Sequence, residues 1–441
     1  MKRTATLYPL STLKNQPSFV QLGPYNPLDP TAIKRPSVVG PFQGIFTIVN
    51  TCALAALAVV SAASAQSTLT IDGYIDRGYV STNNTNNTKD AKSVSSNAGT
   101  TTVGIKGSED LGGGLKAGFS VNTDWSEASG QSQDGTPPTS AQSGFANGQS
   151  YLELISAQVG TLRLGNPNSE VLTITTGVAS PAFSTGVGSA YSSTFSIHNG
   201  YGTGKTGDNN IISNSTIGAG TSAGTNAGQR QIRQANTIKY ISPTFSGFNV
   251  ILATVRKNDT GGTTDVVGVT EFAANYTNGP LVVGFASTKI STGASVYANN
   301  STSNGTGMTA NSSSTMSILG ASYQVLPVLK LHAGLGRSSS SGVVGVPGTA
   351  NGTTAPDTSS YQVGATYNVT PVITLMAQYV KVNDKSFTDL DRTLTGLGAD
   401  YSFSKTTRAY VRYDNVNYAS NFTAFNGTKQ TRTAIGVSKS F

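Results

Sequence analysis

The chain has little cysteine, little charge and no helical patterning. Its single cysteine, Cys52, lies in an apolar segment near the start, so a mature chain cleaved after that segment would contain none. This excludes a disulfide framework and thiol catalysis. Charged residues make up 11% of the 441 residues, whereas a soluble globular domain usually carries about 25%. The composition therefore argues against an ordinary soluble protein.

No apolar run is long enough for a transmembrane helix. The most apolar segment, residues 45–60, is interrupted by polar residues, whereas a spanning helix needs about 20 predominantly apolar ones. The basic pair Lys34-Arg35 precedes it, and Ser64-Ala65-Gln66 follows with the small residues of a signal-peptide cleavage site. We therefore expect residues 1–65 to be a leader and signal peptide, cleaved after Ala65, and residues 66–441 to form the mature barrel described below.

The mature chain also lacks a strong charge bias. The formal net charge of +8 falls to +4 for residues 66–441, because the leader holds five basic residues and one acidic residue. No basic run interleaved with aromatic residues occurs in the sequence. Nucleic acid is therefore not an expected partner.

The chain is rich instead in segments that alternate apolar and polar residues at period two, bounded by Gly, Pro, Asn and Ser clusters. Such segments predict β-strands. Seven short turns alternate with eight longer loops, as an even-stranded barrel with both chain ends on the periplasmic side requires. The sixteen predicted strands are residues 68–80, 100–109, 114–126, 149–158, 161–166, 234–243, 246–258, 264–278, 280–290, 315–326, 328–338, 359–370, 372–382, 392–404, 406–418 and 430–441.

The two faces of these strands are expected to meet different surroundings. In the segment 406–418, Ala409 and Val411 alternate with Arg408 and Arg412, so the charges share one face. A sheet rolled shut satisfies its backbone groups where the medium offers no hydrogen bonds. We therefore predict an all-β fold, a transmembrane antiparallel β-barrel of 16 strands in the bacterial outer membrane. Aromatic residues that suit the two membrane interfaces are Trp125, Tyr240, Tyr379, Phe403 and Phe441.

One connection is far longer than the others. Residues 167–233 contain no long strand pattern and are rich in Gly, Ser, Thr and Asn. Such a stretch inside an ordered domain is usually functional or disordered. Because it follows the fifth predicted strand, it is the third external loop.

Four motifs, in order along the mature chain, resemble signatures of the Gram-negative general porins. They are Leu69-Thr70-Ile71-Asp72-Gly73-Tyr74-Ile75-Asp76, Val103-Gly104-Ile105-Lys106-Gly107-Ser108-Glu109-Asp110-Leu111-Gly112-Gly113-Gly114-Leu115-Lys116-Ala117, Gly160-Thr161-Leu162-Arg163-Leu164-Gly165 and Asn236-Thr237-Ile238-Lys239-Tyr240-Ile241-Ser242-Pro243-Thr244-Phe245-Ser246-Gly247-Phe248. The resemblance implies a sixteen-stranded homotrimeric diffusion channel. It also implies that the third loop, residues 167–233, folds into the barrel and narrows it.

The chain departs from the porin pattern at two places. Asn166-Pro167 stands where many relatives have Arg-Gln, so one expected cation in the lumen is missing. Pro181-Ala182-Phe183-Ser184-Thr185 lacks the acidic residue of the Pro-Glu-Phe-Gly-Gly motif that some porins carry. The charge of the constriction therefore has to be read from this chain's own residues.

We expect charged side chains to line the narrow part of the lumen, because a solute surrounded by low dielectric feels each fixed charge strongly. Glu170 and Asp208 are the only acids of the long loop. A basic wall facing so few acids predicts a weak preference for anions, although each side chain could instead be an ordinary solvated group bonded to its neighbours. The expected wall cations are Lys106, Arg163, Lys239, Arg408 and Arg412, with Lys116 and Arg432 nearer the periplasmic end.

The sequence does not predict an enzyme. Gly220-Thr221-Ser222-Ala223-Gly224 matches a nucleophile-elbow string, but no buried strand precedes it and no helix follows it. Gly204-Lys205-Thr206 ends like a phosphate loop but lacks the first glycine. The two histidines, His198 and His332, have no cysteine co-ligands. We expect no catalytic residues, no metal and no cofactor.

The prediction is a passive outer-membrane diffusion channel for small hydrophilic solutes and ions. Its expected partners are further copies of the chain in a homotrimer, outer-membrane lipid and lipopolysaccharide. Two alternatives remain open at this point. One is a secreted or surface β-solenoid adhesin, which would show a repeat of roughly 20 to 50 residues that we do not find. The other is a porin with a substrate-specific site.

Overall fold

The computed structural model describes residues 67–84, 89–124, 146, 148–189, 233, 236–256, 267–292, 307–344, 357–385, 391–419 and 429–441. The predicted leader, residues 1–65, lies outside these ranges, as do Trp125 and Asp208. Their assigned roles therefore remain predictions.

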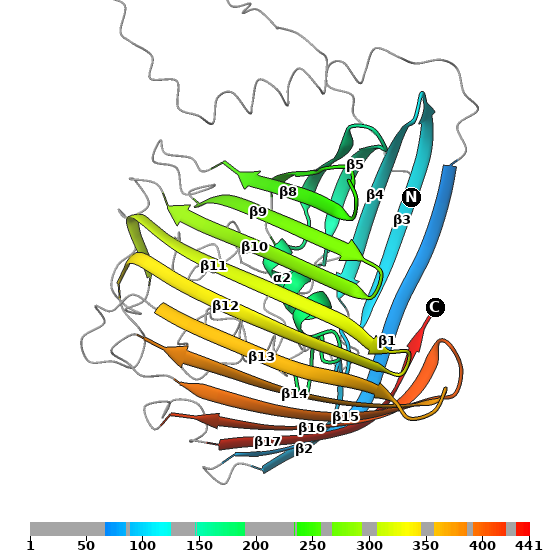
Figure 1. Cartoon of the computed structure of the whole chain (residues 1–441), viewed down its shortest axis with the longest axis vertical. Coiled ribbons are helices and arrows are strands. Elements are labelled where there is room, and N and C mark those ends of the chain that lie inside the picture. The colour runs from blue at the N-terminus through cyan, green and yellow to red at the C-terminus, as the bar shows by residue number, and fades with distance from the viewer. Residues whose placement is uncertain are drawn as a thin grey trace, which may run out of the picture. The chain divides into compact units, whose positions relative to one another are not determined.

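The described chain is almost entirely antiparallel sheet (Figure 1). Each predicted strand has a counterpart in it, and the ends differ mostly by a few residues. The strands are β1 (Ser67–Asn84), β2 (Lys89–Ser95), β3 (Thr102–Gly112), β4 (Leu115–Asp124), β5 (Ser150–Ser156), β6 (Gly160–Asn166), β7 (Thr237–Ile241), β8 (Phe248–Val255), β9 (Val267–Asn278), β10 (Leu281–Thr292), β11 (Gly307–Leu326), β12 (Leu329–Val344), β13 (Asp357–Asn368), β14 (Ile373–Asp384), β15 (Arg392–Ser402), β16 (Thr407–Tyr418) and β17 (Lys429–Ser440).

These seventeen segments fill sixteen places in a closed wall. Strands β2 and β3 share one place, because both pair with β1, β2 opposite Arg77–Asn83 and β3 opposite Ser67–Tyr74. Strand β17 pairs with the other edge of β1 and closes the ring. The predicted sixteen-stranded barrel is confirmed. The solenoid alternative is wrong, because the closing pair joins the first and last described strands, β1 and β17, rather than neighbouring repeats.

The sequence pattern does not predict β2, most of whose residues, Lys89–Ser95, are polar. It pairs with Arg77–Asn83 of β1, across and beyond the predicted end of that strand at residue 80. Alternation of apolar and polar residues reveals a strand only when one of its faces is apolar. Strand β2 is mostly polar on both faces, so it shows no such alternation.

The outer face of the barrel is apolar, as the alternation predicted. Val411 and Leu335 are exposed, whereas Arg412 and His332 on the same strands are buried on the inner face. Of the expected interfacial aromatics, Phe403 is exposed and packs edge-on against Tyr401 with ring centroids 5.2 Å apart. The other three described ones are Tyr240, which donates to the Val159 carbonyl, Tyr379, which packs beside Tyr361, and exposed Phe441.

The chain leaves the wall after β6 and folds inside the barrel as α2 (Glu170–Ile174) and the π-helical turn η1 (Thr175–Ala179) (Figure 1). The Ser169 hydroxyl oxygen caps α2 by accepting from the Leu172 amide at 3.1 Å. Val171 and Ile174 pack on Met316 and neighbouring inner-wall residues. The described part of the third loop therefore occupies the lumen. Among the described residues, no helix is long and apolar enough to cross a membrane.

Candidate functional site

The candidate site is the part of the lumen that the third loop narrows. We call residues 168–189, the part of the loop that the structure describes, the constriction segment. It runs from the inner face of β7 and β9, across β10 to β12, to the inner face of β14 and β16. Its position depends on two anchors and on close contact with the wall between them.

Close contact with the wall is possible because glycines lie beneath the segment. A Cβ atom at Gly320 would lie 2.9 Å from Ile174 Cγ2, and one at Gly334 would lie 2.6 Å from Ala179 Cβ. Both distances are far below ordinary van der Waals contact, so these positions accept only glycine at the observed separation. The two glycines let the backbone of η1 lie directly on β11 and β12.

The first anchor is a buried ion pair at the start of the segment. The Lys239 ammonium lies 3.0 Å from Glu170 Oε1 and 3.4 Å from Glu271 Oε1, and it donates to the Asn168 carbonyl at 2.7 Å. Glu271 Oε2 also accepts from the Glu170 amide at 3.0 Å and from the Thr288 hydroxyl at 2.6 Å. The Lys239 side chain is only 1% exposed. Two of the expected site residues, Lys239 and Glu170, therefore form a buried ion pair that holds the constriction segment to the wall.

The second anchor lies at the far end of the segment. The Gly188 amide donates to Asp414 Oδ2 at 2.8 Å, and Gln378 donates to the Gly188 carbonyl. Arg432 Nε donates to Asp414 at 3.1 Å. Arg432 was expected near the periplasmic end, and that expectation is wrong. Because β17 begins at a long loop, Arg432 lies opposite Thr82, close to the loop end of β1.

A second segment also folds inward and contacts the first. Residues 96–101 connect β2 to β3, and the carbonyl of Asn97 accepts from the Val187 amide at 2.9 Å. Buried Asp76 holds this turn, since its carboxylate accepts from the amides of Ala98 at 2.6 Å and Gly99 at 3.1 Å and from the Tyr410 hydroxyl. The sequence pattern does not predict this contact. The only available signal was an acidic residue, Asp76, on the inward face of the first strand.

Two expected arginines share one carboxylate near the middle of the segment. Arg412 Nη1 lies 2.6 Å from Asp400 Oδ1, and Arg408 Nη1 lies 3.0 Å from Asp400 Oδ2. Arg412 is 2% exposed, and its guanidinium carbon lies 5.8 Å from the centre of the Phe183 ring in the constriction segment. Arg408 is 36% exposed and also donates to the Tyr74 hydroxyl at 2.9 Å. Of these two cations, only Arg408 is accessible to solutes.

Two further expected cations lie on β3 and β6, and each has an acidic partner that the sequence does not predict. Another, Lys116 on β4, is exposed. Arg163 Nε and Nη2 donate to Glu153 Oε2 at 3.0 and 2.8 Å, with the guanidinium 4.0 Å from the centre of the Tyr151 ring. Lys106 pairs with Asp72 and is 49% exposed. The strand register explains the first pair, because Glu153 lies directly opposite Arg163.

Every described residue of the expected cation set except Lys116 is therefore paired with a carboxylate. When two opposite charges are in contact, their fields largely cancel at distances beyond a Debye length, which is about 8 Å at physiological salt. The paired cations therefore contribute a weaker field to the passage than unpaired cations would. No group of three or more His, Cys, Asp or Glu side chains suited to a metal ion occurs among the described residues.

Comparisons with known proteins agree with this architecture. A family model described as Gram-negative porin matches residues 53–421. Outer membrane porin protein 32 of Delftia acidovorans is 34% identical over 242 residues. That alignment covers 52% of this chain and 56% of the relative, so the matched region spans just over half of that protein.

Solved porin structures resemble the whole barrel. An anion-selective porin from Comamonas acidovorans superposes with a TM-score of 0.62 at 23% identity, covering 85% of this chain and all of that one. The trimer form of OmpT from Vibrio cholerae superposes with a TM-score of 0.52 at 14% identity, covering 85% of this chain and 99% of that one. At these identities the likeness concerns the fold.

Proposed function

Because the chain belongs to the Gram-negative porin family, we propose that it is a passive outer-membrane channel that passes small hydrophilic solutes and ions. The observation that carries this proposal is a closed barrel with an apolar outer face, whose lumen is narrowed by an anchored segment and lined by paired charges. Solutes can pass through such a lumen without being chemically changed. The protein is accordingly proposed to act without catalytic residues and without a cofactor.

The proposed ion preference is weakly anionic. Among the expected cations that pair with a carboxylate, Lys106 and Arg408 are the most accessible, at 49% and 36% exposure, whereas the Asp400 carboxylate is 6% exposed. The cations thus reach solutes more readily than this acid does. Asp72, at 38% exposure, offsets part of the difference. The porin from Comamonas acidovorans that shares the fold is described as anion-selective, which supports the same sign here.

We also propose that residues 1–65 are removed on export and that residues 66–441 assemble as a homotrimer in outer-membrane lipid and lipopolysaccharide. The apolar outer face supports contact with lipid. The trimer form of the Vibrio cholerae relative supports the oligomer.

Reconstitution of the purified protein into planar lipid bilayers tests the channel function. We expect stepwise increases in current that are linear in voltage, with a reversal potential in a KCl gradient displaced slightly toward that of chloride. A protein that inserts as a folded barrel but never gives current steps would contradict the proposal. A reversal potential on the potassium side would contradict only the anion preference.

The Lys106–Asp72 pair offers a direct test of how charge sets selectivity. Replacing Asp72 with asparagine removes the acid and leaves the Lys106 ammonium in place, so we expect a reversal potential closer to that of chloride. The displacement should shrink as salt is raised, because exposed charges are screened. Lys106→Gln should move the reversal potential in the opposite direction. Equal potentials for both variants would show that this pair lies outside the ion path.

A further inference from the structure

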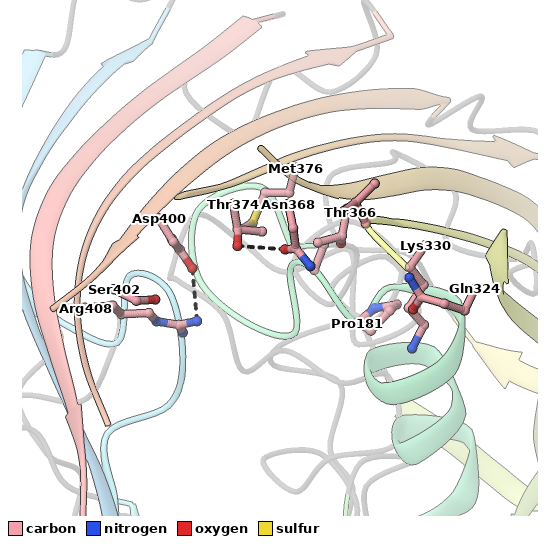
Figure 2. A pocket seen from close by; sticks show the side chains of 12 residues that line it. Pro181, Gln324, Lys330, Thr366, Asn368, Thr374, Met376, Asp400, Ser402 and Arg408 are labelled. Carbon is pink, nitrogen blue, oxygen red and sulfur yellow. Dashed lines mark hydrogen bonds and ion pairs between the residues drawn. The ribbon is translucent and has the colours of Figure 1, made fainter. Parts of the chain in front are cut away.

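A cavity lies beside the constriction segment on the turn side of the barrel. It has a volume of about 330 Å³, opens to the lumen, and is lined by Pro181 and Ala182 of the segment and by the inner faces of β11 to β16 (Figure 2). Asn368, Thr374 and Ser402 belong to it and lie at the turn ends of their strands. A solute that has passed the constriction toward the turns would meet this cavity next.

The charged groups of the cavity favour an anion. Arg408 and Lys330 lie on opposite sides of it (Figure 2). Its one acid, Asp400, is already held between Arg408 and Arg412, at 3.0 and 2.6 Å. Two guanidinium charges against one carboxylate, together with the Lys330 ammonium, leave a positive balance.

The two accessible cations still have donors to offer. A guanidinium has five N–H groups. Arg408 uses three of them, on Asp400, Tyr74 and the Ser438 hydroxyl at 3.1 Å, so two remain. Lys330 forms no ion pair with any residue in the described part of the chain, and its three ammonium protons are available to a ligand.

Neutral side chains between the two cations also point hydrogen-bond donors into the cavity. The Thr374 hydroxyl donates to Asn368 Oδ1 at 2.9 Å, which turns the amide so that its N–H groups face the cavity (Figure 2). Gln324 is an exception, because its amide donates to the Leu326 carbonyl at 2.7 Å and leaves an acceptor at the rim. Met376 and Pro181 add apolar surface. An inorganic anion would leave that surface unused, whereas an organic anion would cover it.

We propose that this cavity is a binding site for small organic carboxylates, which it retains beside the constriction. The carboxylate lies between Lys330 and the amide of Asn368, within reach of Arg408, and its hydrocarbon part contacts Met376 and Pro181. This inference rests on the proposed channel function and names a class of solute for it. A site of this kind slows the passage of chloride while it is occupied.

Benzoate, with benzamide as its uncharged counterpart, tests the proposal on single channels in KCl. We expect benzoate to reduce chloride current in a saturable manner and benzamide to have no such effect. The variant Lys330→Gln should raise the half-blocking concentration of benzoate about tenfold, the usual effect of losing one charge-assisted hydrogen bond. Asn368→Ala should raise it less, and neither variant should change the urea midpoint of unfolding in detergent by much.

The matched control is Lys116→Gln. Lys116 is an exposed lysine at the turn end of β4 and does not line the cavity. Its loss should leave benzoate block unchanged. Equal weakening of block by Lys116→Gln and Lys330→Gln would overturn the site and leave only general attraction of anions. Wild-type channels that conduct without any saturable block would also overturn it, whereas absence of conductance would instead overturn the channel function.

Discussion

Replacing Lys239 with methionine is expected to destabilise the barrel by about 3–5 kcal/mol, the usual effect of removing one partner from a buried ion pair. The ammonium lies between Glu170 and Glu271, and both carboxylates are almost entirely buried. Without it, two carboxylates would face each other with no countercharge. We expect the start of the constriction segment to leave the wall and the single-channel current to become noisier.

The urea midpoint of unfolding in detergent micelles measures the first effect, and the current variance of open channels measures the second. A triple variant, Lys239→Met with Glu170→Gln and Glu271→Gln, serves as the control. It removes the charges together, so it should recover much of the lost stability. If the single variant were as stable as the wild type with quiet current, the pair would not anchor the segment.

The barrel could be predicted from sequence because its cause is local. Lipid outside and water inside impose alternation on each strand, and Val411 beside Arg412 shows it in two residues. The pattern weakens where the constriction segment covers the wall. Ile251, Met316 and Ile318 face inward and pack on α2, so apolar residues there occur on both faces. The strands can still be located from the sequence in this region. Their inner face, however, is not uniformly polar.

The charge arrangement could be predicted only in part. The sequence indicates which cations face the lumen, because each lies at a known phase of its strand. It does not indicate which acid meets which base. Some partners lie on consecutive strands, as Arg163 and Glu153 do, and others come from distant parts of the chain. Lys239 and Glu271 lie on β7 and β9, and Glu170 lies in the loop. Register across strands and the path of the loop decide these pairs, and both are consequences of the whole fold.

The second large effect is expected from Gly334→Leu. A Cβ atom there would lie 2.6 Å from Ala179 Cβ and 3.0 Å from Gln362 Cγ, so the new side chain has no room while η1 stays on the wall. Overpacking of this kind usually costs about 1–3 kcal/mol. Because the segment is tied at Lys239 and at Asp414, its middle can move only toward the open lumen. We therefore expect a lower single-channel conductance with both anchors intact.

The neighbouring residue provides the control for this prediction. Ala333 precedes Gly334 on β12 and is exposed on the outer face, so Ala333→Leu adds a large side chain on the lipid side of the same strand. That variant should keep the wild-type conductance. Combining Gly334→Leu with Lys239→Met should restore part of the conductance, because a segment freed at one end can swing aside instead of bulging into the passage. Unchanged conductance in Gly334→Leu, in a barrel that still folds, would mean that the segment does not limit the flow.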